Sequence, residues 1–306
     1  MNTLFPIHFG RSCVCGFFCF RIVFFTPFYY FSYPVKHVLL SLALTAVLGV
    51  YAFADADVPP VVGHRGNSSI APENTLSAYR SCIETGAQGA ECDIYRTADG
   101  KLVLDHDGAL KRTVRDANGN PAAGRITDYT LAELRTMDFG VWKGEQFKGE
   151  KVATLEEYLD LLKGTTCAPV VELKQDGLEA DAIAAIRARK MEKETTIIAF
   201  SANAIKECRR LAPEIKAAWL CTRGKKETND QYAERILAKL KEINTTYVDL
   251  EHSAATPEFV KKLHDNGITV MVWTADNPDR IKALFDMGVD SVTTNVPATA
   301  LEIWKK

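Results

Sequence analysis

The chain has 306 residues, of which 47% are hydrophobic and 25% are charged, so it has the composition of a globular protein with a sizeable core. Its formal net charge of −2 provides no basic excess, which argues against a nucleic-acid partner. The length allows one large domain or two small ones.

The first 54 residues differ from the rest and predict a leader segment. Lys36 precedes an apolar run at 38–50, and Ala52-Phe53-Ala54 follows it. This order is typical of a secretory signal peptide, and the run is shorter than the roughly 20 residues of a membrane span. We therefore expect 1–54 to be removed and the protein to be exported, to a periplasm or the exterior. Residues 1–34 would then reflect a mis-assigned start; the alternative is that the N-terminal segment anchors the protein in a membrane.

Two short extended segments carry polar side chains that suggest an active site. The segment 61–66 ends on His64-Arg65-Gly66. In the segment 90–95, Glu91 and Asp93 lie on one face, because the side chains of a strand alternate between its two faces. Taken singly, buried carboxylates usually pair with Lys or Arg in a structural role, so the functional interpretation depends on their neighbours.

A third segment brings a histidine back toward these carboxylates. Asp99-Gly100 lies between two alternating runs and is a hairpin signal, whereas a parallel crossover would need about a dozen residues or more. The return strand 101–106 therefore runs antiparallel to 90–95 and ends at His106. Paired carboxylates with a histidine beside them suit a hard metal ion next to an acid–base group.

The rest of the chain alternates strands and helices. With the return strand set aside as a hairpin, eight strands each followed by a helix predict an α/β fold, a (β/α)8 TIM barrel over 58–306. In that fold the active site lies at the carboxyl ends of the strands, where Glu172 and Lys174 also share one face. The predicted strands are 61–65, 90–95, 169–174, 196–200, 217–221, 247–251, 268–273 and 290–294.

Residues 108–150 interrupt this alternation and predict a short insertion after the hairpin that follows the second strand. The stretch is polar and rich in glycine, with a turn at 118–121 and a short helix at 130–137. We expect Trp142 and Phe147 to pack in a small core of this insertion rather than to contact substrate. A further helix is predicted from Pro72 to Gly86, capped by Asn74 or Thr75.

The cysteine pattern gives no zinc signature outside the leader. Most of the five cysteines lie in apolar settings and are expected to be small core residues, although one disulfide is possible in an exported protein. They are Cys82, Cys92, Cys167, Cys208 and Cys221.

Several short motifs together resemble the signature of the glycerophosphodiester phosphodiesterase family, a GDPD domain of the phospholipase-C-like phosphodiesterase superfamily. The resemblance covers roughly residues 60–300, with the motifs in the order and close to the spacing of that family. Two positions depart from its pattern: Ala153 stands where the family usually has Pro, and Asn295 where it commonly has Asp. The motifs are His64-Arg65-Gly66, Ala71-Pro72-Glu73-Asn74-Thr75, Glu91-x-Asp93, Asp99-Gly100 and His106-Asp107.

The resemblance implies roles for the polar residues. His64 and His106 would be a general base and a general acid, and Glu91, Asp93 and Glu172 would be metal ligands. Because these three ligands offer only oxygen, they favour one Mg²⁺ or Ca²⁺ ion over zinc.

Other residues are candidates for binding an anionic substrate. Arg65 and Lys174 could screen a phosphodiester, and Trp273 would lie under its glycerol group by analogy with the family. Glu73 is a possible site residue, although a role at the start of the following helix would also explain it. Glu251 ends the sixth predicted strand and could line the pocket.

The implied reaction is metal-dependent hydrolysis of a glycerophosphodiester to sn-glycerol 3-phosphate and an alcohol. The resemblance also implies attack by the substrate's own glycerol hydroxyl, through a cyclic phosphate that water then opens. The alternatives are a lysophospholipase D-like or other phosphodiesterase on the same barrel, and a binding protein without activity. We expect a small-molecule substrate, no nucleic acid and no stable protein partner.

Overall fold

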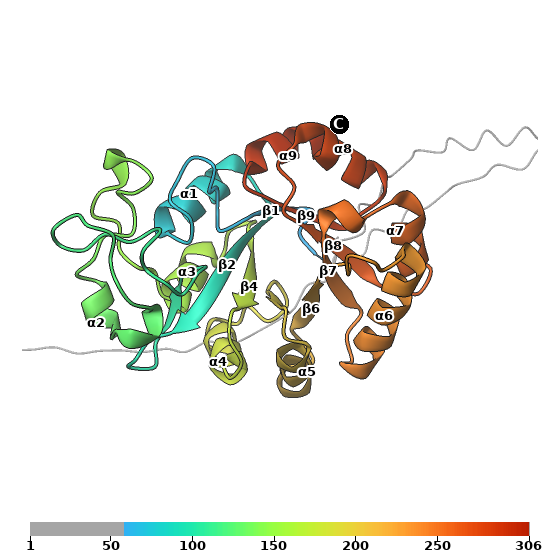
Figure 1. Ribbon diagram of the computed structural model, residues 1–306, viewed down its shortest axis with the longest axis horizontal. Coiled ribbons are helices and arrows are strands. Elements are labelled where there is room, and N and C mark those ends of the chain that lie inside the picture. Colours follow the sequence, from blue (N-terminus) through green and yellow to red (C-terminus); the bar gives the residue numbers. More distant parts are fainter. Residues whose placement is uncertain (1–57, 306) are drawn as a thin grey trace, which may run out of the picture. The chain divides into compact units, whose positions relative to one another are not determined.

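The computed structural model describes residues 58–305, which form one compact unit (Figure 1). The predicted leader, 1–54, lies outside the described residues. None of the helices within 58–305 is long and apolar enough to cross a membrane.

Within the described residues, eight parallel strands close into a barrel surrounded by helices (Figure 1). The strand order is β1-β9-β8-β7-β6-β5-β4-β2, and pairing of Val62 with Gly89 closes β1 onto β2. The predicted (β/α)8 barrel is therefore confirmed. The strands are β1 (Val61–Gly63), β2 (Gly89–Arg96), β4 (Ala168–Leu173), β5 (Thr196–Ala199), β6 (Lys216–Cys221), β7 (Tyr247–Glu251), β8 (Thr269–Trp273) and β9 (Ser291–Thr294).

One long helix follows each barrel strand. After β2, this helix comes only after the hairpin strand and the insertion. Many begin at a threonine or serine whose hydroxyl accepts a backbone N–H, as Thr154 does from Glu157, so the sequence itself marks the helix starts. The helices are α1 (Leu76–Thr85), α3 (Leu155–Leu162), α4 (Glu179–Arg189), α5 (Ala202–Leu211), α6 (Asn229–Glu242), α7 (Pro257–His264), α8 (Pro278–Asp286) and α9 (Pro297–Trp304).

Strand alternation divides the core into two parts. Val171 belongs to the main cluster between strands and helices, whereas Val170 belongs to a smaller cluster inside the barrel with Ile198 and Met271. Glu172 follows the same alternation as Val170 and therefore points into the barrel, where it lines a pocket. The two-residue period is what aims the strand-end side chains at a common centre.

The hairpin and the insertion after the second strand are also confirmed. Strand β3 (Leu102–Leu104) pairs antiparallel with β2, with Leu104 opposite Ile94. The insertion contains η1 (Ile126–Asp128), α2 (Leu131–Leu134) and η2 (Glu145–Phe147), and lies against the side of the barrel that carries α1 and α3 (Figure 1). Contacts there include Ser77 with Glu150 and Arg135 with Glu157.

The core of the insertion is built from residues other than those predicted. Trp142 and Phe147 are only partly buried and lie outside its cluster, although the Trp142 indole N–H donates to the Phe139 carbonyl at 3.1 Å. Smaller apolar side chains fill the space instead. The buried members of the cluster are Val103, Leu110, Val114, Ala122, Ile126, Leu134, Phe139 and Val152.

Helix α1 starts later than predicted. Thr75 is its N-cap and accepts from the Ala78 N–H, and Gly86 ends it with a left-handed φ of 80°. Residues 72–74 remain outside the helix because Asn74 adopts a positive φ of 57°, which a helix does not allow. All five cysteines among the described residues are buried and free, which confirms the expectation that most of them are core residues.

Candidate active site

The loop after β1 starts the site. The His64 backbone N–H donates to the Thr294 carbonyl at 2.8 Å, which ties this loop to the end of β9. Arg65 and Gly66 then take positive φ values of 55° and 84°. A Cβ on Gly66 would lie 2.7 Å from the carbonyl carbon of Ala78, so only glycine fits this turn against α1. The turn aims the Arg65 backbone N–H at Glu91 Oε2, 2.8 Å away.

Three carboxylates meet at the carboxyl ends of β2 and β4. One oxygen from each of Glu91, Asp93 and Glu172 lies within 4.8 Å of the others, and all three residues are buried. Burial, and next the charge of Asp93, raise the pKa of Glu172 to about 7, and the same two causes raise the pKa of Glu91. The cluster therefore concentrates negative charge that needs a cation.

Asp93 is the carboxylate most tightly held by neighbouring groups. Burial opposes ionisation, but Lys174 and Arg65 keep the pKa of Asp93 below its usual value. Lys174 Nζ lies 3.2 Å from Asp93 Oδ1 and 2.9 Å from Glu172 Oε1, and Asn74 Nδ2 donates to Asp93 Oδ2 at 2.8 Å. Asp93 thus keeps its charge and a fixed orientation.

Asn74 is a site residue whose role the sequence analysis missed. Its Oδ1 accepts from the Asp93 backbone N–H at 3.1 Å and from the Tyr79 hydroxyl at 2.9 Å. Asn74 is buried and lies outside α1, so its side chain holds Asp93 in place and does not cap the helix. The signal that could have found it is the tolerance of Asn for positive φ, in a motif that also contains Pro72 and Glu73.

The cluster fits a hard divalent cation. Its donors are carboxylate oxygens, and Glu91 Oε1 is buried with no hydrogen-bond partner among residues 58–305. An orphaned, buried carboxylate oxygen beside two further carboxylates is the arrangement that Mg²⁺ or Ca²⁺ satisfies.

His64 and His106 both line the pocket, but they differ in what holds them. His64 Nδ1 lies 2.8 Å from Asn295 Oδ1, whereas His106 Nδ1 lies 2.7 Å from the carboxylate of Asp107. Burial and then the charge of Arg65 lower the pKa of His64 to about 4, so it is neutral at pH 7. The side chain of His106 is a third exposed.

A chain of ion pairs connects His106 to the insertion. Arg112 Nε donates to Asp107 Oδ2 at 2.6 Å, and the two terminal nitrogens of Arg112 donate to both oxygens of Glu73 at 2.7 and 2.8 Å. Glu73 also accepts from Arg65 Nη1 at 2.7 Å. The interpretation of Glu73 as a helix-start residue is wrong, because α1 begins only at Leu76 and Glu73 instead orients two arginines.

The pocket enclosed by these residues has a volume of about 90 Å³. Trp273 and Phe200 form part of its wall, with their rings edge to face at 5.5 Å between centroids. Asp249 lies on its wall with both carboxylate oxygens unpartnered among residues 58–305. The residues that line the pocket are His64, Arg65, Glu91, His106, Glu172, Lys174, Ile198, Phe200, Leu220, Asp249, Trp273, Thr274 and Thr293.

Three predicted candidates lie outside that lining: Asp93, Glu73 and Glu251. Asp93 is paired with Arg65 and Lys174, which both line the pocket. Glu73 acts on the pocket through Arg65, as described above. Glu251 instead accepts from the backbone N–H and the hydroxyl of Ser253, and so caps the short helix η3 (His252–Ala254).

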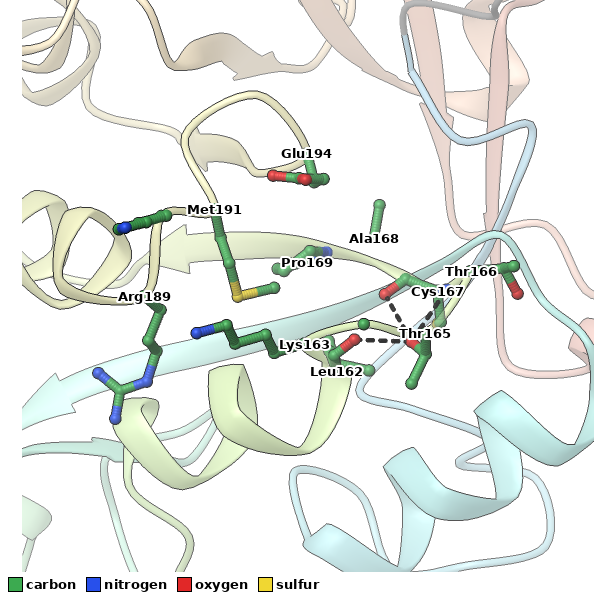
Figure 2. A pocket seen from close by; sticks show the side chains of 12 residues that line it. Leu162, Lys163, Thr165, Thr166, Cys167, Ala168, Pro169, Arg189, Met191 and Glu194 are labelled. Carbon is green, nitrogen blue, oxygen red and sulfur yellow. Dashed lines mark hydrogen bonds between the residues drawn. The ribbon is translucent and has the colours of Figure 1, made fainter. Parts of the chain in front are cut away.

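A larger groove of about 420 Å³ lies at the opposite end of the barrel, near the start of β4 (Figure 2). Arg189, one of the cations that line it, pairs with both oxygens of Asp160 at 2.7 and 2.8 Å. The hydroxyl of Thr165 donates to the Leu162 carbonyl and accepts from the Cys167 N–H, as Figure 2 shows. These local contacts stabilise a loop, and this end of a TIM barrel is the one that contributes stability and not catalysis.

A barrel whose strand ends gather three carboxylates, two cations and two histidines defines a class of phosphodiester-cleaving enzyme. The profile of the glycerophosphoryl diester phosphodiesterase family matches residues 64–299. The chain therefore belongs to the glycerophosphoryl diester phosphodiesterase family.

Curated relatives match this chain over most of their length. The chain is 30% identical over 251 residues to the glycerophosphodiester phosphodiesterase of Caldanaerobacter subterraneus subsp. tengcongensis, covering 80% of this chain and 98% of the relative. It is 31% identical over 256 residues to the glycerophosphodiester phosphodiesterase of Bacillus subtilis, covering 77% of this chain and 83% of that protein.

Solved structures show the same barrel. An Oleispira antarctica phosphodiesterase in complex with the product sn-glycerol-3-phosphate superposes with a TM-score of 0.70 at 26% identity, covering 81% of this chain and 98% of the other. A glycerophosphodiester phosphodiesterase from Parabacteroides distasonis superposes with a TM-score of 0.62 at 29% identity, covering 80% and 96%.

Proposed function

We propose that this chain hydrolyses glycerophosphodiesters to sn-glycerol 3-phosphate and an alcohol, with one divalent metal ion and two histidines. The observation that carries the proposal is the convergence of Glu91, Asp93 and Glu172 within 4.8 Å. Two of these carboxylates, Glu91 and Glu172, line a pocket that His64 and His106 also line. The relatives' printed activities, and the product bound to the Oleispira enzyme, support glycerophosphodiesters as substrates.

Glu91, Asp93 and Glu172 would hold the metal. When bound, Mg²⁺ or Ca²⁺ offsets the charge of the phosphodiester and of the oxygen on which negative charge develops. Arg65 and Lys174 also line the pocket and add positive charge there, and Arg65 is held in place by Glu73 at 2.7 Å. Trp273 gives the glycerol group a flat apolar wall.

The two histidines would divide the proton transfers. His64 is neutral at pH 7 and has its Nδ1 engaged by Asn295, so Nε2 is the nitrogen that can take a proton from the attacking hydroxyl. His106 has an anion on its Nδ1, which suits the residue that donates a proton to the leaving alcohol. The same transfers serve whether the attacking hydroxyl is water or the glycerol hydroxyl of the substrate.

The test is release of sn-glycerol 3-phosphate from glycerophosphocholine by the purified protein, with EDTA and then with Mg²⁺ or Ca²⁺ restored. Metal-restored release is expected, and the more effective ion identifies the cofactor. Release that EDTA does not change would overturn the metal-dependent mechanism. Absence of release with either ion would overturn the proposal that glycerophosphodiesters are the substrates.

A second candidate substrate, a lysophospholipid, is favoured by one observation. Phe200 is 50% exposed although it lines the pocket beside Trp273. An exposed aromatic ring at the mouth could contact an acyl chain. Faster turnover of lysophosphatidylcholine than of glycerophosphocholine, lost in F200S, would establish this preference.

We also propose that residues 1–54 direct export. The support is the order of basic, apolar and Ala-x-Ala segments before Ala54. Mass spectrometry of protein recovered from outside the cytoplasm should find a mature amino terminus at Asp55. A terminus that retains 38–50 would support the membrane anchor instead.

A further inference from the structure

Asp276 fixes the orientation of the Asn295 side chain. Asn295 Nδ2 donates to Asp276 Oδ2 at 2.6 Å. The other oxygen, Asp276 Oδ1, accepts from the Asn295 backbone N–H at 2.8 Å and from the Thr294 hydroxyl at 3.1 Å. Both carboxylate oxygens therefore act as acceptors, and a flipped amide would place its oxygen against Oδ2. Only the orientation with Nδ2 toward Asp276 satisfies these contacts.

This orientation turns Asn295 Oδ1 toward the loop after β1. There Oδ1 accepts from the Ser68 hydroxyl at 2.7 Å and lies 2.8 Å from His64 Nδ1. Because an amide oxygen only accepts, the hydrogen in this contact must be on Nδ1. Neutral His64 therefore has its lone pair on Nε2, the ring nitrogen that Asn295 leaves unengaged.

We propose that Asn295, anchored by Asp276, is a positioning residue that holds His64 in the tautomer required of the catalytic base. The proposal rests on the proposed function, in which His64 Nε2 removes the proton from the attacking hydroxyl. Asp276 follows β8 and Asn295 follows β9, whereas His64 follows β1. Residues after the last two strands of the barrel therefore determine the tautomer of a histidine after the first strand.

The neutral amide distinguishes this arrangement from a direct histidine–carboxylate pair. The charged and titratable groups that shift the pKa of His64 are Arg65 in its own loop, Asp93 on β2 and His106 after β3. The other charged and titratable groups that line its pocket are Glu91, Glu172, Lys174 and Asp249. The Asp276 carboxylate reaches His64 only through the amide. Asn295 thus fixes the tautomer without placing an anion on His64 Nδ1. The neutral amide stabilises a positive charge on the ring less than a carboxylate in direct contact would.

The decisive experiment exchanges the two residues. N295D alone would place two carboxylates at the 2.6 Å contact and should lose both activity and thermal stability. The double variant D276N/N295D restores one donor and one acceptor there, but puts the anion on His64 Nδ1. We expect it to recover most of the kcat lost in N295D, with the acid limb of its pH profile raised by about 1 pKa unit or more.

N295A removes the acceptor and leaves the ring free to change tautomer. We expect kcat to fall about 10-fold or more with KM nearly unchanged, because general-base catalysis contributes about 10²–10⁴-fold and needs the correct nitrogen. N266A, which removes an exposed asparagine bonded to Lys262, is the matched control and should leave kcat unchanged. Wild-type kcat in N295A, or an unmoved acid limb in an active D276N/N295D, would overturn the proposal.

A spectroscopic measurement separates this proposal from the proposed function. In protein labelled with ¹⁵N-histidine, the His64 signals can be assigned by their loss in H64Q. They should show a protonated Nδ1 and an unprotonated Nε2 in the wild type, and a mixture in N295A. A protonated Nε2 in the wild type would refute the tautomer even in an active enzyme, whereas failure of glycerol 3-phosphate release with the expected tautomer would refute only the function.

Discussion

The two histidines line one pocket, and the parts of the molecule that hold them differ. His64 is held from within the barrel, by an amide that follows β9. His106 is held by Asp107, whose second oxygen is bound by Arg112 of the insertion. The barrel thus supplies a neutral partner, and the loop region supplies an anionic one.

The contacts that hold His64 are fixed by the barrel, whereas those that hold His106 can vary with the insertion. The barrel side is fixed by strand register, since β1 pairs with β9 and the His64 backbone N–H bonds the Thr294 carbonyl. The insertion side rests on partly exposed ion pairs, which contribute less and tolerate change. We expect the proton acceptor to be the more sensitive of the two, and the proton donor to be tunable from the insertion.

The largest effects should come from removing each histidine. H64A and H106A should each lower kcat on glycerophosphocholine by about 10²–10⁴-fold, the usual contribution of general acid–base catalysis. The comparison is sharpened by a glycerophosphodiester with a p-nitrophenol leaving group, which needs no proton donor. That substrate should restore much of the rate to H106A and little to H64A.

The roles would be reversed if the activated substrate rescued H64A instead. Equal rescue of both variants would mean that neither assignment holds. Circular dichroism and thermal unfolding of both variants are the control for folding.

A large effect is also expected at the proposed metal ligands. E172Q removes a charge from the cluster and should weaken Mg²⁺ or Ca²⁺ binding by about 10-fold or more, measured by calorimetric titration. E251Q is the matched control, because Glu251 caps η3 outside the pocket and should leave the metal affinity unchanged. Unchanged titration in E172Q would remove Glu172 from the ligand set.

The barrel was predictable because its pattern is local and repeated. Short apolar strands such as 247–251 alternate with capped helices, and the two-residue period alone puts Glu91, Asp93 and Glu172 on interior faces. The hairpin at Asp99-Gly100 likewise follows from turn chemistry. These features depend on neighbouring residues in the sequence, so they can be read without coordinates.

The parts that were missed depend on contacts between distant segments. Asn74 holds Asp93, which lies 19 positions away in the sequence, and Asn295 orients His64, which lies 231 positions away. The role of Glu73 depends on Arg112, which the irregular insertion brings to it. Local propensity favoured a helix start at 72–75, and tertiary contacts overrode it.

A moderate effect is expected from the ion pairs of the insertion. R112A should lower kcat by about 3- to 10-fold at pH 7, because exposed ion pairs contribute up to about 1 kcal/mol each. The hydrogen bond from Arg112, and next the one from His106, lower the pKa of Asp107 to about 2. Asp107 therefore stays ionised at pH 7 in R112A, and the variant loses orientation more than charge.

The pH dependence checks this interpretation. Because the pKa of Asp107 is lower in the folded protein than in the unfolded chain, its ionisation stabilises the folded state above about pH 4. This stabilisation is lost as the pH falls toward 2. R112A should thus lose thermal stability relative to wild type above pH 4 and approach it near pH 2. R112K, which keeps the charge without the planar fork, should fall between them, and R112A unfolding at the wild-type temperature throughout would contradict the role of this pair.

An effect on stability alone, and on the barrel side only, is expected at Asp249. Burial, and next the charge of Glu172, raise the pKa of Asp249 well above its usual value. Because the unfolded chain ionises first, the folded state loses stability as the pH rises from about 4 through the native pKa. D249N keeps the shape and removes the ionisation, so its unfolding temperature in EDTA should fall less between pH 4 and pH 8.

At pH 8 the variant should be more stable than wild type, because folding of the wild type must either bury the charge of Asp249 or take up a proton that the unfolded chain has released. D265N, at an exposed aspartate after α7, is the control and should follow the wild-type curve. Parallel curves for D249N and wild type would show that Asp249 has a partner in solution, such as a bound water network that stabilises its charge. The same series repeated with the metal bound should narrow the difference between D249N and wild type, since a cation on Glu172 removes the charge that opposes ionisation of Asp249.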